Sequence, residues 1–111
     1  MIKASFSSTN GRYVSFSFEG HSGFDVKGKD IVCAAVSTLA QHTARILAKR
    51  CGAIVEKKHA RLNVQIPCPN ELSDLLVEEL YESVEDIRSQ YPRNLSVEVK
   101  VDEDRHTIVR S

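Results

Sequence analysis

The segment IKASFSSTNGRYVSFSF, residues 2–18, decides the fold class of this chain. Apolar and polar residues alternate on both sides of Asn10-Gly11, a dipeptide that readily adopts the positive φ angles of a tight two-residue turn. This pattern predicts a β-hairpin with one buried face and one solvated face. Sheets that expose one face to water are typically antiparallel, so we expect a mainly antiparallel sheet.

The rest of the chain adds helical segments and further strands to this hairpin. The predicted elements are a helix over 30–50, strands over 53–58 and 61–66, a helix over 71–90, a strand over 95–101 and a last strand within RHTIVR, residues 105–110. The order ββα-ββα-β(β) indicates an α+β fold in which the two amphipathic helices pack on one face of the sheet.

Each predicted helix has one apolar face. In the first helix this face comprises Val32, Val36, Leu39, Thr43, Ile46 and Leu47. In the second helix it comprises Leu72, Leu76, Leu80, Val84 and Ile87. Gly52 is a suitable end for the first helix, and Asn70 is a suitable N-cap for the second.

The composition is that of an ordinary globular protein. The chain has 111 residues, of which 41% are hydrophobic and 27% charged, which predicts a single domain over 1–111. No window approaches the roughly 20 apolar residues of a membrane span, and the N-terminus has no apolar secretory segment. We therefore expect a cytoplasmic protein with no membrane partner. The three cysteines form no CxxC pair, so neither a disulfide framework nor a metal site is predicted, and no cofactor is expected.

Cys33 is a candidate nucleophile at the start of the first helix. If Asp30 is the N-cap, Cys33 is the third helical residue, where unpaired backbone N–H groups and the helix dipole stabilise a thiolate. The same N–H groups could donate to an oxyanion on an attacked carbonyl. The alternative is that Cys33 is a small buried residue, as unpaired cysteines commonly are. Its place beside Ser37, off the centre of the apolar face, favours a groove or a close subunit contact over a densely filled core.

His21 is a candidate proton-transfer partner for that thiol. It is predicted at the end of the second strand, between Gly20 and Gly23, which allow unusual backbone angles. An imidazole, with a pKa of about 6.5, suits the transfer of a proton from a thiol and to an amine. The residues between His21 and Asp30 are enough for the chain to turn back, which would bring His21 to Cys33. The alternative is a plain loop histidine.

The stretch GHSGFDVKGKDIVCAAVSTLA, residues 20–40, resembles the signature of the bacterial ribosomal-processing cysteine protease family, Prp. The family pattern opens with Gly-His-Ala and closes with Gly-x-Asp-Ile-Val-Cys-Ala-Ala-Val-Ser, which residues 28–37 match. Ser22 stands where the family more often has alanine. Outside residues 20–40 the resemblance rests on chain length and the order of elements.

The resemblance implies a homodimeric endopeptidase that removes the N-terminal extension of the large-subunit ribosomal protein bL-twenty-seven during ribosome assembly. It makes Cys33 the nucleophile and His21 the general base and acid. Asp30 either orients the imidazole as a third catalytic member or caps the helix. Ser37 either hydrogen-bonds at the site or packs there.

The segment between His21 and Cys33 is predicted to be a substrate loop. It contains or borders Gly20, Ser22, Gly23, Phe24 and Gly28. Its glycines predict mobility, and its one large apolar side chain could close over a bound peptide and exclude water.

A second interpretation starts from the uneven charge. Residues 1–68 hold ten Lys and Arg against four Asp and Glu, whereas residues 69–111 hold five against eleven. The basic residues within 49–61 could serve a non-enzymatic ribosome- or RNA-associated binding module. That module would be expected to have interleaved aromatic residues, which this segment lacks. The protease interpretation requires no direct nucleic-acid binding.

Overall fold

A computed structural model of the chain describes residues 1–20, 31–103 and 106–110. The elements are β1 (Ile2–Thr9), β2 (Arg12–Gly20), α1 (Ile31–Cys51), β3 (Ile54–Lys58), β4 (Arg61–Gln65), α2 (Glu71–Gln90), β5 (Leu95–Glu103) and β6 (His106–Arg110). This sequence of elements confirms the predicted order ββα-ββα-β(β), with the last strand present and paired antiparallel with β5.

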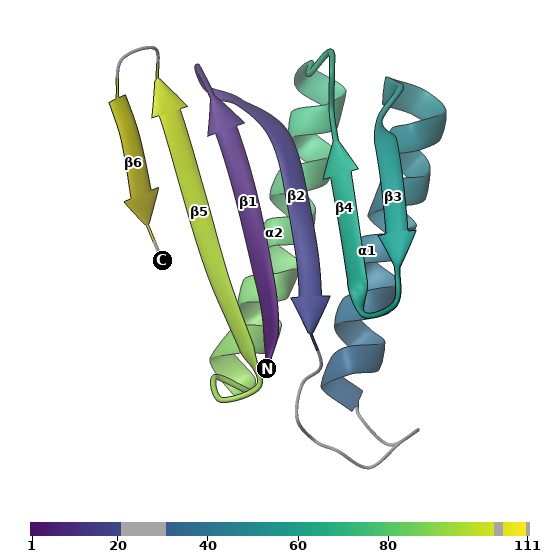
Figure 1. Cartoon of the computed structure of the whole chain (residues 1–111), viewed down its shortest axis with the longest axis vertical. Coiled ribbons are helices and arrows are strands. Elements are labelled where there is room, and N and C mark those ends of the chain that lie inside the picture. The colour runs from purple at the N-terminus through teal and green to yellow at the C-terminus, as the bar shows by residue number, and fades with distance from the viewer. Residues whose placement is uncertain (21–30, 104–105, 111) are drawn as a thin grey trace.

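The strands form one six-stranded sheet in the order β3-β4-β2-β1-β5-β6 (Figure 1). Neighbouring strands are antiparallel except β1 and β5, which run parallel with Ile2 opposite Leu95. The parallel pair arises because α2 carries the chain from β4 across the face of the sheet to the far side of β1. A mainly antiparallel sheet is therefore confirmed, with one parallel pair, β1 and β5, next to the central pair.

The first hairpin has the predicted turn. Asn10 and Gly11 both have positive φ angles, 51° and 82°, as a two-residue turn of the type favoured by twisted hairpins requires. The pairing that follows places Phe6 opposite Phe16 and Ala4 opposite Phe18. These side chains share one face of the sheet, which is the face that the helices cover.

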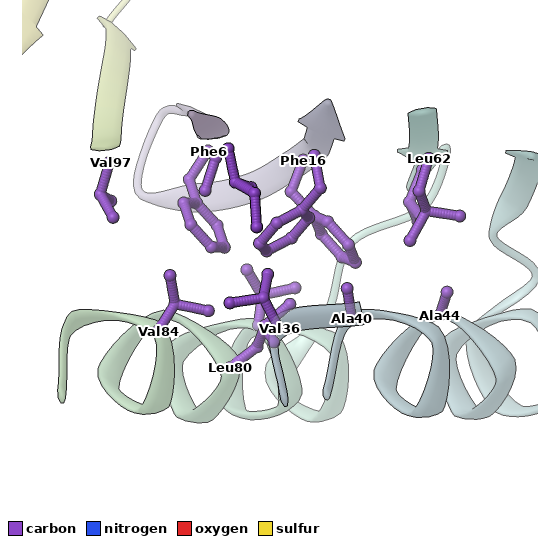
Figure 2. Close-up of a cluster of buried hydrophobic side chains, with 14 of the residues drawn as sticks. Phe6, Phe16, Val36, Ala40, Ala44, Leu62, Leu80, Val84 and Val97 are labelled. Atoms are coloured by element: carbon purple, nitrogen blue, oxygen red, sulfur yellow. The ribbon is translucent and has the colours of Figure 1, made fainter. Parts of the chain in front are cut away.

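Both helices lie on that one face, behind the sheet in Figure 1. Figure 2 shows the core layer between the sheet and the helices, where Phe6 and Phe16 from the sheet meet Val36 from α1 and Leu80 from α2. Phe6 also packs edge-on against Tyr81, with ring centroids 5.4 Å apart. Burial of this aromatic and aliphatic layer is the main favourable contribution to folding.

The buried helix faces differ in detail from the sequence-based prediction. In α1, Ala40 and Ala44 are buried with the predicted Val32, Val36, Thr43 and Leu47. In α2, Leu72 is 45% exposed and was wrongly predicted to face the core. Ser73 and Val77 are buried instead, because Ser73 turns inward to cap the helix and so sets its rotation.

The second hairpin confirms its predicted strands but not a buried face on both of them. Leu62 and Val64 of β4 are buried, whereas every residue of β3 is exposed. Ile54 is 62% exposed and Val55 38%. The reason is position, because β3 is the outermost strand and only the flank of α1 lies beside it.

Helix α1 is long and apolar enough, by length and composition, to cross a membrane. The expectation that no segment approaches that limit was therefore wrong for α1. Its buried face, from Val32 to Leu47, packs against the sheet. A core helix of a globular protein meets the same criterion, and α1 has the one-sided burial of such a helix.

Polar contacts fix α2 to the sheet. Its start is closed by a capping box, in which the Ser73 N–H donates to Asn70 Oδ1 and the Asn70 N–H donates to Ser73 Oγ, both at 2.8 Å. The next residue, Asp74, accepts hydrogen bonds from the Arg12 guanidinium at 2.7 Å and from the Tyr13 N–H at 3.0 Å. These contacts join α2 to the start of β2.

Candidate active site

A pocket of about 260 Å³ lies where β2 ends and α1 begins. Its floor is apolar and comes from both layers, with Ile2, Phe18, Val36, Ala40 and Leu62 in it. Cys33 and Ser37 of α1 line one side. The groove that was predicted beside Cys33 is therefore present.

Cys33 is the third residue of α1, as predicted. Its side chain is half-buried and reduced. In the first turn of a helix the backbone N–H groups have no intrahelical acceptor, and the partial positive charge of the helix end is greatest there. Cys33 therefore combines access to the pocket with a setting that favours a thiolate.

Gly20, the last residue of β2, lines the same pocket. Its φ angle is +96°, and a Cβ atom there would collide with the carbonyl oxygen of Met1. Its N–H donates to the Ala60 carbonyl at 2.9 Å, which ties the end of β2 to the β3–β4 turn. Only glycine fits this position, and it fixes the point at which the chain leaves the sheet beside Cys33.

A directed chain of hydrogen bonds leads to Ser37. Lys57 Nζ donates to Gln41 Oε1 at 2.5 Å, and Gln41 Nε2 donates to Ser37 Oγ at 2.6 Å. Because an ammonium group can only donate, it sets the direction of the amide and makes Ser37 Oγ an acceptor. A serine hydroxyl that accepts a hydrogen bond still carries its own proton, which it can donate to another group.

The same rim of the pocket is positively charged. Lys57, Lys58 and Arg61 of the β3–β4 hairpin line it, and Glu19 is the acidic residue among the lining side chains that the structure describes. Lys58 also lies 3.8 Å from Glu56, but both side chains are largely exposed, so this pair adds little. A cationic rim near Cys33 favours a thiolate further.

Several predicted site residues lie outside the described residues. His21, Ser22, Gly23, Phe24, Gly28 and Asp30 all belong to the segment 21–30. The predicted loop closure and both roles of Asp30 belong to that segment too. Of the predicted residues, the structure brings together Gly20, Cys33 and Ser37.

Two further residues of the site were missed from sequence. Gln41 follows Cys33 and Ser37 at intervals of four residues, so helical spacing alone places it on the same face. Lys57 had no comparable signal, because its place depends on the β3–β4 hairpin lying beside α1. The remaining cysteines, Cys51 and Cys68, do not line this pocket. In the described part of the chain, no three His, Cys, Asp or Glu residues are placed to hold a metal ion.

Comparisons with known proteins agree with this arrangement. The family model described as cysteine protease Prp matches residues 1–96. The crystal structure of SMU.848 from Streptococcus mutans superposes with a TM-score of 0.72 at 25% identity, covering 94% of this chain and 96% of that one. No curated protein sequence gives a significant match.

Two structures of the ribosomal processing protease Prp from Staphylococcus aureus share the fold. The complex with a substrate peptide has a TM-score of 0.79 at 17% identity, covering 90% of this chain and all of that one. The complex with a covalently linked product peptide has a TM-score of 0.76 at 16% identity, covering 94% of this chain and all of that one.

Proposed function

Because the chain belongs to the cysteine protease Prp family, whose model matches residues 1–96, we propose that Cys33 and His21 are its catalytic pair. We propose further that its substrate is the precursor of the ribosomal protein bL-twenty-seven, from which it removes the N-terminal extension during ribosome assembly.

One observation carries the assignment of the pair. Gly20 and Cys33 line the same pocket, and Gly20 is the residue directly before His21. Adjacent Cα atoms are about 3.8 Å apart, so the described position of Gly20 is compatible with a histidine next to it acting on the thiol. We propose that the imidazole of His21 reaches Cys33 from this end of β2, and the shared pocket of Gly20 and Cys33 supports that proposal.

The proposed reaction is acyl transfer through the thiol. His21 takes the thiol proton, and the Cys33 sulfur attacks the carbonyl carbon of the scissile bond. The resulting oxyanion accepts hydrogen bonds from N–H groups in the first turn of α1. The bond to nitrogen then breaks, and the departing amine takes the proton from His21. Water, deprotonated by the same imidazole, hydrolyses the thioester and regenerates the thiol.

Ser37 has a supporting role in this proposal. The Gln41 amide donates to its Oγ, which leaves the Ser37 hydroxyl proton free to be donated toward negative charge in the pocket. Replacing Gln41 with Glu would put an acceptor where the amide donates and reverse that direction. We expect kcat to fall about tenfold, the usual scale for one misdirected hydrogen bond, and the Gln41→Asn variant to serve as a control for side-chain length.

Asp30 has two candidate roles, as helix cap and as orienting group for His21. Asp30→Ser separates them, because serine is a good N-cap but cannot orient an imidazole as a carboxylate does. Unchanged kcat with unchanged stability assigns the cap. A large fall in kcat with unchanged stability assigns the catalytic role.

The proposed setting is a cytoplasmic homodimer that acts on a peptide segment and needs no cofactor. An apolar pocket floor beside the thiol suits an apolar side chain of the substrate. A purely RNA-binding role for residues 49–61 has no support from the family. Lys57, Lys58 and Arg61 border the pocket instead.

The experiment that tests the proposal is incubation with the purified ribosomal protein precursor. The wild type is expected to release the extension at one position, read by intact mass. Cys33→Ala and His21→Ala are expected to release none, while the matched Cys68→Ala variant, altered at an exposed cysteine, retains full activity. Full cleavage by Cys33→Ala or by His21→Ala overturns the proposed pair.

A further inference from the structure

A second hollow continues from the pocket along α1. It has a volume of about 610 Å³ and lies between the C-terminal half of α1 and the β3–β4 hairpin. Its lining residues are Thr38, Gln41, His42, Ala44, Arg45, Ala48, Val55, Lys57 and Leu62. Gln41, Lys57 and Leu62 line both hollows, so the two are parts of one groove.

The bond from Lys57 to Gln41 crosses this groove where its two parts meet. It joins β3 to α1 through two exposed side chains at 2.5 Å. Exposed polar contacts of this kind stabilise a fold little and exchange readily with other partners. The groove is therefore divided by a side-chain bridge and not by backbone or core packing.

The second part of the groove has the chemistry of a peptide subsite. Its floor is apolar, with small alanines on α1 facing Leu62 of β4, and Figure 2 shows Ala44 and Leu62 across from each other. Val55 lies at its edge, 38% exposed on the outermost strand. An apolar side chain seated there would cover this surface.

The charges along this part of the groove are of one sign. Arg45 and Lys57 line it with His42, whose Nδ1 lies 3.3 Å from the Arg45 guanidinium. No acidic side chain is among its described lining residues. An occupant with lysine or arginine at this point would meet like charges, so the groove favours an uncharged or acidic segment.

The length of the groove sets the distance from the reaction. The α1 residues that line the second hollow run from Thr38 to Ala48, so its middle is about ten residues beyond Cys33 on the same helix, which is about 15 Å at a rise of about 1.5 Å per residue. An extended peptide rises about 3.3 Å per residue. The middle of the second hollow is therefore about five peptide residues from the scissile bond.

We infer that this hollow is a second substrate subsite, which binds an apolar, non-basic side chain about five residues from the scissile bond. The inference rests on the proposed function of Cys33. It predicts that short peptides are poor substrates although they contain the scissile bond. It also predicts that the groove outside the catalytic pocket determines which precursor is selected.

The test compares three peptides taken from the precursor around its cleavage site. One has three residues on each side of the scissile bond, and each of the others is extended to eight residues on one side only. Burial of one apolar side chain predicts that one extended peptide has a KM about tenfold lower than the short one. Placing lysine in the fifth position of that peptide is expected to remove the gain.

Ala48→Trp fills the hollow and provides the matching protein variant. We expect it to raise KM about tenfold for the favoured long peptide and to leave the short peptide unchanged. Leu75→Trp, at an exposed position on α2, is the control and should change neither. Thermal denaturation of both variants checks that they fold.

The outcomes separate this inference from the proposed function. Equal KM values for all three peptides, or an equal effect of Ala48→Trp on long and short peptides, overturn the second subsite while cleavage by Cys33 stands. If the wild type cleaves neither the precursor nor any peptide, the proposed function fails. Binding of the long peptide to Cys33→Ala, measured by fluorescence anisotropy with and without Ala48→Trp, then still tests the subsite.

Discussion

The third residue is a cysteine in α1 and a serine in α2, and these two residues have different surroundings. In α2 this residue is Ser73, fully buried and engaged with Asn70 in a capping box. In α1 it is Cys33, half-buried at the wall of a pocket. The donor groups at the start of α2 are satisfied within the fold, whereas in the proposed reaction those at the start of α1 are directed to a substrate.

The two helices also differ in how they are attached. Side chains of Asp74 and Glu78 tie α2 to the start of β2, so α2 is fixed at its capped end. Helix α1 is linked to the sheet by the exposed hydrogen bond between Lys57 and Gln41. We therefore expect changes at the start of α2 to affect stability, and changes at the start of α1 to affect activity.

The largest expected effect is that of Cys33→Ala on activity. Loss of a nucleophile costs at least about a thousandfold in kcat/KM. The free energy of unfolding should change by less than about 1 kcal/mol, because only one half-buried atom is removed. Peptide cleavage assays and urea unfolding check the two values. Substantial remaining cleavage would show that α1 does not carry the nucleophile.

Gly20→Ala is expected to have the next largest effect, on stability. It adds a Cβ at a positive φ angle and against the Met1 carbonyl, which together cost about 2–5 kcal/mol. Gly52→Ala is the matched control, with φ +67° and open space around it, and should cost about 1 kcal/mol. Similar losses in urea unfolding for both variants would mean that the close approach at Gly20 is unimportant.

Ser73→Ala is expected to lower stability and to leave activity unchanged, the opposite of what is expected for Cys33→Ala. It removes one side of the capping box and leaves the Asn70 N–H without its acceptor, a loss of about 1–2 kcal/mol. Because α2 does not line the catalytic pocket, kcat/KM should stay unchanged. A fall in kcat/KM without a fall in stability would break the division of roles between the helices.

The smallest expected effect concerns the attachment of α2 at high pH. Burial, followed by the hydrogen bond to Glu78, raises the pKa of Tyr13. A raised folded-state pKa means that the neutral phenol contributes stability below its ordinary pKa of about 10, and that this contribution is lost as the pH rises further. The melting temperature of the wild type should therefore fall more steeply between about pH 9.5 and 11 than that of Tyr13→Phe.

Parallel slopes for the two proteins in that pH range would show that the phenol does not hold α2 through Glu78. Tyr81, whose pKa is also raised by burial, titrates in both proteins and so provides the common background. The difference between the slopes is what isolates Tyr13.

Much of the fold could be predicted from local patterns in the sequence. The alternation around Asn10-Gly11 predicted the first hairpin, and the helix signals at Gly52 and Asn70 predicted the boundaries of α1 and α2. The exposure of β3 and of Leu72 could not be predicted in this way. Burial there depends on which strand is outermost and on how the capping box rotates α2.

The part of the site that could be predicted consists of residues close together in the sequence of α1. The position of Cys33 in the first turn followed from the predicted start of the helix, and Ser37 from helical spacing. Lys57 and the strand residues of the apolar floor, Ile2, Phe18 and Leu62, are remote in sequence from Cys33. Their contribution depends on the order of strands in the sheet, which no short stretch of sequence specifies.

The most direct test of the central claim compares the reactivity of two cysteines as a function of pH. Alkylation by iodoacetamide, followed by peptide mass spectrometry, reports Cys33 and the exposed Cys68 in the same sample. If the start of α1 stabilises a thiolate, Cys33 reacts with an apparent pKa well below the ordinary value of about 8.5, and it reacts faster than Cys68 at neutral pH despite being less exposed. If Cys33 instead titrates at or above Cys68 and reacts more slowly throughout, the account of α1 as the catalytic helix is contradicted.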